Sequence, residues 1–208
     1  MADDYVELAR VVATIDGDVT IALDLSHLAL DSAPSAAQEN LVRIATALPG
    51  DRYVQVGAED ASRASAILDC VVGAHEAGAR VMATLQANLH RSPADADRLA
   101  EAGIPVRLVK GAYMESASIA HRYGEETDAA FARLAQRLHA AGATVVLATH
   151  DPVLRELLPS AGVEALLGVR PDDARAAVAA GRHTRLYVPY GSDWFRYWMR
   201  RVAESRGA

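Results

Sequence analysis

The chain has 208 residues, of which 51% are hydrophobic and 23% are charged, and this composition suits a single globular domain over residues 1–208. The formal net charge of −6 contains no long run of one sign, which argues against general nucleic-acid binding. A single cysteine, Cys70, excludes an internal disulfide and a cysteine-cluster zinc site, and we expect a buried, inert thiol. No apolar run approaches the roughly 20 residues that span a bilayer, and no signal sequence is evident, so we expect a cytoplasmic protein.

Short β-branched or aliphatic runs alternate with alanine-rich helical stretches along the whole chain. We expect strands at 19–23, 53–56, 81–85, 106–110, 144–148, 163–167 and 184–188. We expect helices at 4–15, 35–48, 61–77, 92–102, 125–141, 152–158, 171–180 and 193–204. Ser35 and Ser92 are the expected N-caps, and Gly78, Gly142 and Gly181 are the expected helix stops.

Seven strands alternating with helices predict a mostly parallel α/β sheet with right-handed crossovers. An open doubly wound sheet and a (β/α)8 barrel both satisfy this order, although such a barrel usually has about 250 residues and one strand more. Polar or aromatic residues end almost every strand, which favours a barrel mouth over the single crevice of an open sheet. The residues at or after the predicted strand ends are Asp24, Ser26, Gly57, Ala58, Glu59, Gln86, Lys110, Tyr113, Thr149, His150, Asp151, Tyr187 and Tyr190.

The common nucleotide-binding and hydrolase motifs are absent: there is no GxGxxG, Walker loop, GxSxG or HExxH. The seven histidines form no helical i,i+4 pair, so we expect no metal site. His150 alone lies at a predicted strand end, where a hydrogen-bonding role and a surface position remain open. Arg200 and Arg201 point about 100° apart on the last helix, so they can address two anionic groups or form an exposed pair.

Several motifs occur together in an order that resembles the proline dehydrogenase family. They are Arg107-Leu-Val-Lys-Gly-Ala-Tyr113, Tyr187-Val-Pro-Tyr-Gly191, Arg200-Arg201-x-x-Glu204, Thr84-Leu-Gln-Ala87, Arg91-Ser-Pro93 and Ala148-Thr-His150. Together they span roughly residues 20 to 204. The resemblance implies a distorted (β/α)8 barrel that binds FAD and oxidises proline by hydride transfer to the flavin, with a quinone, oxygen or another acceptor reoxidising it.

The resemblance also implies roles for individual residues. Arg200 and Arg201 would hold the substrate carboxylate, with Arg201 also near the flavin and Glu204 holding the arginine pair. Tyr187, Tyr113, Leu166 and Tyr190 would line the substrate pocket. The flavin would be contacted by Gln86, Arg107, Val109, Gly111, Ala112, Thr149 and His150. Lys110, the single lysine beside 20 arginines, lies in the flavin-contacting strand and joins Tyr187 and Asp24 as a catalytic candidate.

The sequence departs from the family pattern at several positions. Asp24 stands where the family usually has lysine, and Gly57 where it usually has aspartate. Asp151 and Glu164 replace a usual asparagine and a frequent glutamine. One helix alone precedes the first expected strand, so we expect a barrel that lacks the first strand.

These departures suggest a substrate other than proline, such as a modified proline or another amino acid amine, with Asp24 binding a substrate cation or acting as base. Two other functions remain open. The chain could be a flavin-free relative that binds an amino-acid-like ligand, pairs with itself or completes a partner subunit. It could also be a barrel lyase with Lys110 as a Schiff-base nucleophile.

Overall fold

The computed structural model describes residues 1–191, 195 and 198–199, and these contain one parallel sheet of seven strands in the order β1 to β7. The strands are β1 (Ile21–Leu23), β2 (Val54–Val56), β3 (Val81–Gln86), β4 (Val106–Val109), β5 (Val145–Leu147), β6 (Gly162–Leu166) and β7 (Thr184–Tyr187). Each strand pairs with the next one along the chain, as the alternating pattern predicts. The last expected helix, at 193–204, lies almost wholly outside the described residues.

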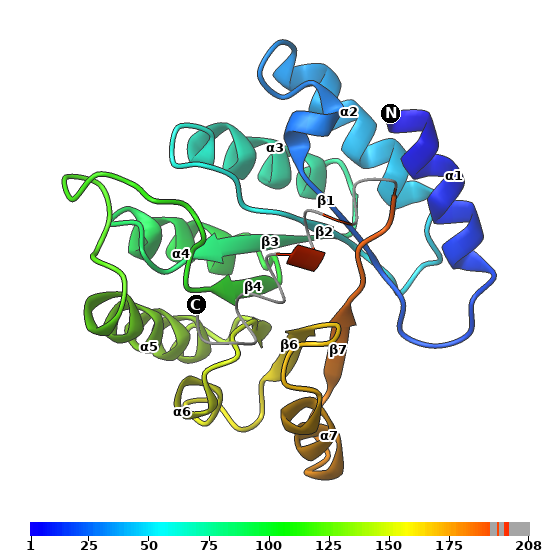
Figure 1. Ribbon diagram of the computed structural model, residues 1–208. Coiled ribbons are helices and arrows are strands. Elements are labelled where there is room, and N and C mark those ends of the chain that lie inside the picture. Colours follow the sequence, from blue (N-terminus) through cyan, green and yellow to red (C-terminus); the bar gives the residue numbers. More distant parts are fainter. Residues whose placement is uncertain (192–194, 196–197, 200–208) are drawn as a thin grey trace.

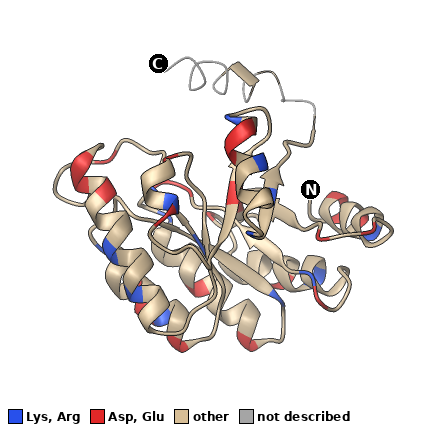
Figure 2. Ribbon diagram, turned by 90° about the horizontal axis from the view of Figure 1, so that it is seen from below, with Lys and Arg blue, Asp and Glu red and all other residues tan. Residues whose placement is uncertain are grey.

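Helices follow one another around the outside of the curled sheet in chain order (Figure 1). They are α1 (Ala2–Ala13), α2 (Pro34–Thr46), α3 (Ala64–Glu76), α4 (Ser92–Glu101), α5 (Glu125–Ala140), α6 (Pro152–Arg155) and α7 (Pro171–Ala179), with a short 3₁₀ helix, η1 (Leu25–Leu28), after β1. Acidic and basic residues are interspersed on these outer elements (Figure 2). In the described part of the chain, no helix is long and apolar enough to cross a membrane.

The two faces of the sheet differ in chemistry. Outward side chains such as Leu23, Val56 and Leu108 are at most 4% exposed and join the aliphatic core beneath the helices. The alternate residues, among them Gln55 and Arg107, point to the inside of the curve. Helices therefore cover one face of the sheet only, which is the arrangement of a barrel and not of a doubly wound sheet. The prediction of a distorted barrel-type α/β fold is confirmed.

Two predicted helix caps are wrong. Ser35 and Ser92 lie inside the first turns of α2 and α4, because Pro34 opens the one helix and Ser92 opens the other. The Ser92 hydroxyl instead donates to the backbone oxygen of Gln86 at 2.5 Å. Cys70 is buried as predicted, and burial raises the pKa of its thiol to about 11.

An ionic network connects strands across the inner face. Glu164 on β6 is 5% exposed and accepts from Arg107 Nε on β4 at 2.6 Å. Arg185 on β7 lies 4.0 Å from the same carboxylate. With its amide nitrogen facing Glu164, Gln55 on β2 donates to this carboxylate at 2.9 Å. The network satisfies charges that the curved sheet removes from water.

The same network reaches the segment before β1. Arg185 donates two hydrogen bonds to Asp18, at 2.7 and 2.8 Å, and His183 lies 2.5 Å from that carboxylate. Arg185 also stacks over the ring of Tyr53, with its guanidinium carbon 4.8 Å from the ring centre. Side chains therefore link β7 to the segments that precede β1 and β2.

Replacing Asp18 by asparagine tests this link. Hydrogen bonds from Arg185 and His183 outweigh partial burial and hold the pKa of Asp18 below its usual range, so its stabilisation is complete above the unfolded-state pKa of about 4. We expect Asp18→Asn to lower the urea midpoint at pH 7, with the difference from wild type shrinking as the pH falls through the folded-state pKa. Asp172→Asn, at an exposed carboxylate on α7, is the control. If Asp18→Asn and wild type had the same urea midpoint at pH 7, this link would be contradicted.

Candidate active site at the carboxyl ends of the strands

The strand ends form one rim, because all seven strands are parallel. Gln86 ends β3 opposite Val109 of β4, and Leu166 ends β6 opposite Tyr187 of β7. Arg107 lies inside β4, and the remaining predicted site residues within the described chain follow strand ends at the same rim: Asp24, Lys110, Gly111, Ala112, Tyr113, Thr149, His150 and Tyr190. Arg200, Arg201 and Glu204 lie outside the described residues.

Hydrogen bonds connect the segments at the carboxyl ends of β1, β2 and β3. Glu59, which is 7% exposed, accepts from the backbone N–H of Ser26 at 3.0 Å and thereby fixes the start of η1. The side-chain amide of Gln86 donates to the backbone oxygen of Glu59 at 2.8 Å. Glu59 and Gln86 are therefore parts of a rigid frame at this side of the mouth.

Two departures from the family pattern touch each other. A Cβ atom placed on Gly57 would lie 2.0 Å from Oδ1 of Asp24, so the Asp24 carboxylate occupies room that a side chain at position 57 would need. Asp24 is partly buried. Burial raises its pKa, the nearby Glu59 carboxylate raises it further, and His27 opposes both effects. The sequence identified both positions, but it did not indicate that they are in contact.

Two buried polar oxygens near β3 have no hydrogen-bond partner among the described residues. They belong to Thr84, which lies inward beside Arg107, and to Asn88, which lies beside Gly111. Buried polar atoms in native proteins are nearly always satisfied, so these two oxygens can accept hydrogen bonds from a polar ligand at this rim. These oxygens and the Arg107 guanidinium fit the flavin cofactor that the resemblance implies.

Asn88 was missed by the sequence reasoning, although it lies two residues after Gln86 and so follows the same alternation. Its backbone N–H donates to the oxygen of Lys110 at 2.9 Å, which continues the β3–β4 pairing beyond the strands. Asp18 and Arg185 were missed too. Arg185 could have been found from the sequence, because it lies two residues before Tyr187 and therefore on the same face of the strand. The sequence does not indicate Asp18, because its partner Arg185 is 167 residues away.

Lys110 is held by two carboxylates. Its Nζ lies 2.6 Å from Asp128 on α5 and 3.2 Å from Asp151, which caps α6. Burial opposes the positive charge, but the hydrogen bonds that Lys110 donates to Asp128 and Asp151 prevail and raise its pKa. Asp151 replaces the asparagine of the family pattern, and this carboxylate supplies one of the two ion pairs of Lys110.

The residues after β5 make contacts of their own. Thr149 is 7% exposed, and its hydroxyl accepts from the backbone N–H of Asp151 at 3.1 Å. His150 Nε2 accepts from the backbone N–H of Leu166 at 3.4 Å, a long hydrogen bond between the ends of β5 and β6. Tyr113 and Tyr190 are 42% and 86% exposed at the rim.

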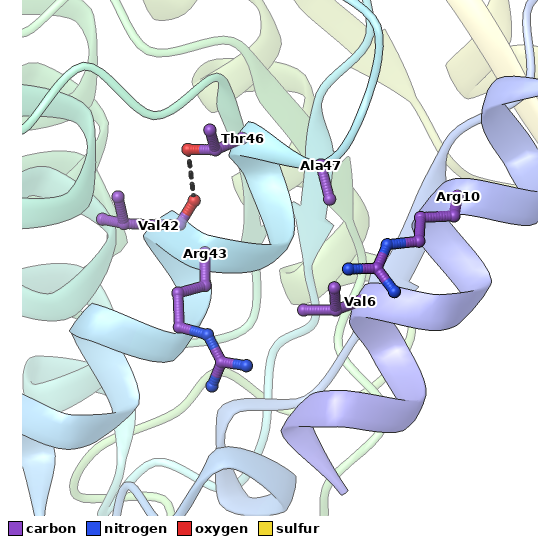
Figure 3. Close-up of a pocket in the computed structure, with 6 residues that line it drawn as sticks. All are labelled: Val6, Arg10, Val42, Arg43, Thr46 and Ala47. Carbon is purple, nitrogen blue, oxygen red and sulfur yellow. Dashed lines mark hydrogen bonds between the residues drawn. The ribbon is translucent and has the colours of Figure 1, made fainter.

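Two cavities lie away from the rim. One, of about 580 Å³, lies on the outside between α1 and α2 and is lined by Val6, Arg10, Val42, Arg43, Thr46 and Ala47 (Figure 3). Its two arginines are paired with Glu7 and Asp3. The other, of about 450 Å³, lies at the amino ends of the strands, where Tyr53, Gly162 and His183 line it. Neither contains a predicted site residue.

Among the residues described, no cluster of three potential metal ligands occurs.

Comparisons of the sequence identify one family, and a solved structure shares the fold. A family model described as proline dehydrogenase matches residues 14–208. Proline dehydrogenase 1 of Bacillus subtilis subsp. natto is 30% identical over 98% of this chain and 72% of its own length, and proline dehydrogenase of Deinococcus radiodurans is 30% identical over 98% and 71%. Proline utilization A of Bdellovibrio bacteriovorus has a similar fold, with a TM-score of 0.80 and 19% identity over 98% of this chain and 28% of that one.

Replacing Gly111 by alanine tests the close approach at the rim. Gly111 has φ +116°, and its added Cβ would lie 2.1 Å from Asn88 Oδ1. Gly142→Ala is the matched control, because Gly142 also has positive φ but open space around it. We expect Gly142→Ala to lower the free energy of unfolding by about 1 kcal/mol and Gly111→Ala by about 2–3 kcal/mol, measured by urea unfolding. Equal losses of unfolding free energy in the two variants would show that the Asn88 side chain moves aside at no cost, which would contradict the close approach.

Proposed function

The chain belongs to the proline dehydrogenase family, and from this we propose that it oxidises the C–N bond of proline or a closely related amino acid amine with FAD as cofactor. The observation that carries the proposal is the extent of the family match. It covers residues 14–208 and therefore every strand whose carboxyl end contributes to the rim. The two unsatisfied oxygens of Thr84 and Asn88 support a bulky polar ligand at this rim.

FAD, when bound, supplies the acceptor for a hydride. We assign its binding to the rim of β3, β4 and β5. The residues are Gln86, Arg107, Val109, Gly111, Ala112, Thr149 and His150, with Arg201 and Glu204 from the C-terminal segment. Arg107 is the cation of this set within the described chain, and Glu164 orients its inward guanidinium through a hydrogen bond of 2.6 Å. A fixed guanidinium favours negative charge that develops beside it.

The substrate is assigned to the rim of β6 and β7. Arg200 and Arg201 bind its carboxylate, since a guanidinium holds a carboxylate through two parallel hydrogen bonds. Tyr187 packs against the substrate, with Leu166, Tyr113 and Tyr190 around it. Leu166 and Tyr187 are opposite each other in the strand register, which supports a common wall.

The paired aspartates give Lys110 a defined role in this proposal. An ammonium fixed between Asp128 and Asp151 ties the end of β4 to α5 and α6, and so holds the backbone of Gly111 and Ala112. Lys110 then acts on the cofactor site through the position of this backbone. We also propose that residues 1–208 act as one domain in the cytoplasm, with a quinone or oxygen as terminal electron acceptor.

A titration tests the activity. Purified protein is supplied with FAD, dialysed and titrated anaerobically with L-proline and with ring-substituted prolines, while the flavin absorbance is followed. We expect retained yellow colour and bleaching by at least one of these amines. Protein that stays colourless after FAD addition, or flavin that no amine bleaches, would overturn the proposal.

Separate variants test the arginine pair. We expect Arg200→Ala and Arg201→Ala each to raise the KM for the amino acid about 10- to 100-fold, which corresponds to a loss of roughly 1.5–3 kcal/mol of charge-assisted hydrogen bonding. Arg175→Ala, at an exposed arginine on α7, is the control and should leave KM unchanged. An unchanged KM in both rim variants would remove the pair from the substrate site.

A further inference from the structure

The Asp24 carboxylate is placed so that it can bind a cation. Leu23 points outward into the core, so by alternation Asp24 points inward at the end of β1. Its side chain is partly buried, and within the described part of the chain no hydrogen bond or ion pair holds its carboxylate. A carboxylate in such a place is costly unless a positive or hydrogen-bond-donating group meets it.

Gly57 creates the room for this carboxylate. Because even a Cβ at position 57 would lie 2.0 Å from Asp24 Oδ1, the two residues fit as a pair. The backbone N–H of Gly57 donates to the oxygen of Leu23 at 2.8 Å, which fixes the two strand ends beside each other. This chain therefore presents a carboxylate from β1 and none from position 57.

Among the described residues, the charged groups that affect Asp24 are Glu59 and His27, and neither is an arginine or lysine. On the β2 side lies Glu59, a second carboxylate, whose nearest guanidinium is Arg63 at 3.8 Å. On the η1 side lies His27, which accepts or donates a hydrogen bond of 2.9 Å with the Tyr5 hydroxyl of α1. Burial raises the pKa of the Tyr5 hydroxyl, and the charges of Asp24 and Tyr187 raise it further.

Resting on the proposed function, we propose that Asp24 binds the ammonium group of the amino acid substrate and takes up one of its protons. The N–H bond of the ammonium breaks and an O–H bond forms on Asp24, so the carboxylate becomes a neutral carboxylic acid and the amine regains its lone pair. The lone pair is then available for the C=N bond, and FAD, when bound, would supply the acceptor for the hydride from the adjacent carbon. A protonated amine has no lone pair to offer, which is why a base is needed here.

Burial and Glu59 raise the pKa of Asp24, which supports this role, because a base works best when its pKa lies near the operating pH. Asp24 must be ionised to accept a proton, so the rate of flavin reduction falls as the pH falls through the pKa of Asp24. This acid limb should lie above the usual carboxyl range.

The first test measures binding without turnover. FAD-loaded protein is reduced beforehand, and the dissociation constants of L-proline and of its ring-oxygen analogue, tetrahydrofuran-2-carboxylate, are measured by calorimetry. We expect Asp24→Asn to weaken proline binding roughly tenfold and to leave the analogue unchanged, since only proline carries the ammonium. Asp172→Asn, at an exposed carboxylate, should change neither constant. Equal effects of Asp24→Asn on both ligands would overturn the proposal.

The second test measures the rate of flavin reduction against pH. We expect Asp24→Asn to slow reduction about 100-fold or more at neutral pH and to remove the acid limb. Gly57→Ala keeps Asp24 but displaces its carboxylate, and it should also slow reduction, whereas Gly50→Ala, in open space, should not. An acid limb that persists in Asp24→Asn would overturn the proposal.

The two proposals fail in different ways. If wild-type protein takes up no FAD or is not reduced by any amine, the proposed oxidation is wrong, and the comparison of the two ligands on the FAD-free protein still decides whether Asp24 binds the ammonium. If wild type is reduced normally while Asp24→Asn keeps both its ligand preference and its acid limb, the assignment of Asp24 alone is wrong.

Discussion

The burial of aliphatic side chains between the strands and the outer helices determines the rest of the structure. Residues such as Val56 and Leu108 are fully buried on the outer face, and each such side chain contributes about 1.5–3 kcal/mol to folding. Because side chains alternate along a strand, this commits every second residue to the inside of the curve. The inner face can then carry polar groups, and the parallel order brings the strand ends to one rim.

The charges of the inner face are arranged so that most have a partner. Glu164 lies between Arg107 and Arg185, and Asp18 continues the series to the segment before β1. Burying a charge is costly, so removing one partner of Glu164 would leave an uncompensated charge in the interior. Asp24 differs from them, since the described residues form no hydrogen bond or ion pair with its carboxylate at the end of β1.

Lys110 is conspicuous in the sequence, and the structure shows that two carboxylates hold its ammonium. It is the single lysine of the chain, and it lies within the motif that carries the family resemblance. Its ammonium nevertheless faces Asp128 and Asp151 at the helix side of the rim. The motif therefore combines inward groups, such as Arg107, with an outward group that fixes the following backbone. The composition alone cannot separate these two roles.

The sequence by itself determined the order of the elements, the barrel-type fold and the family, because hydrophobic periodicity and short motifs are local properties of the chain. It also identified Asp24, Gly57 and Glu164 as unusual. It placed Ser35 and Ser92 wrongly as caps, since the first turn of a helix depends on neighbours as well as on propensity. Only the tertiary structure decided that Asp24 fills the room left by Gly57, that Glu164 joins two arginines, and that Asp18 reaches Arg185. Each of these contacts joins residues far apart in the chain, and such partners are chosen by strand register and curvature, which no local pattern encodes.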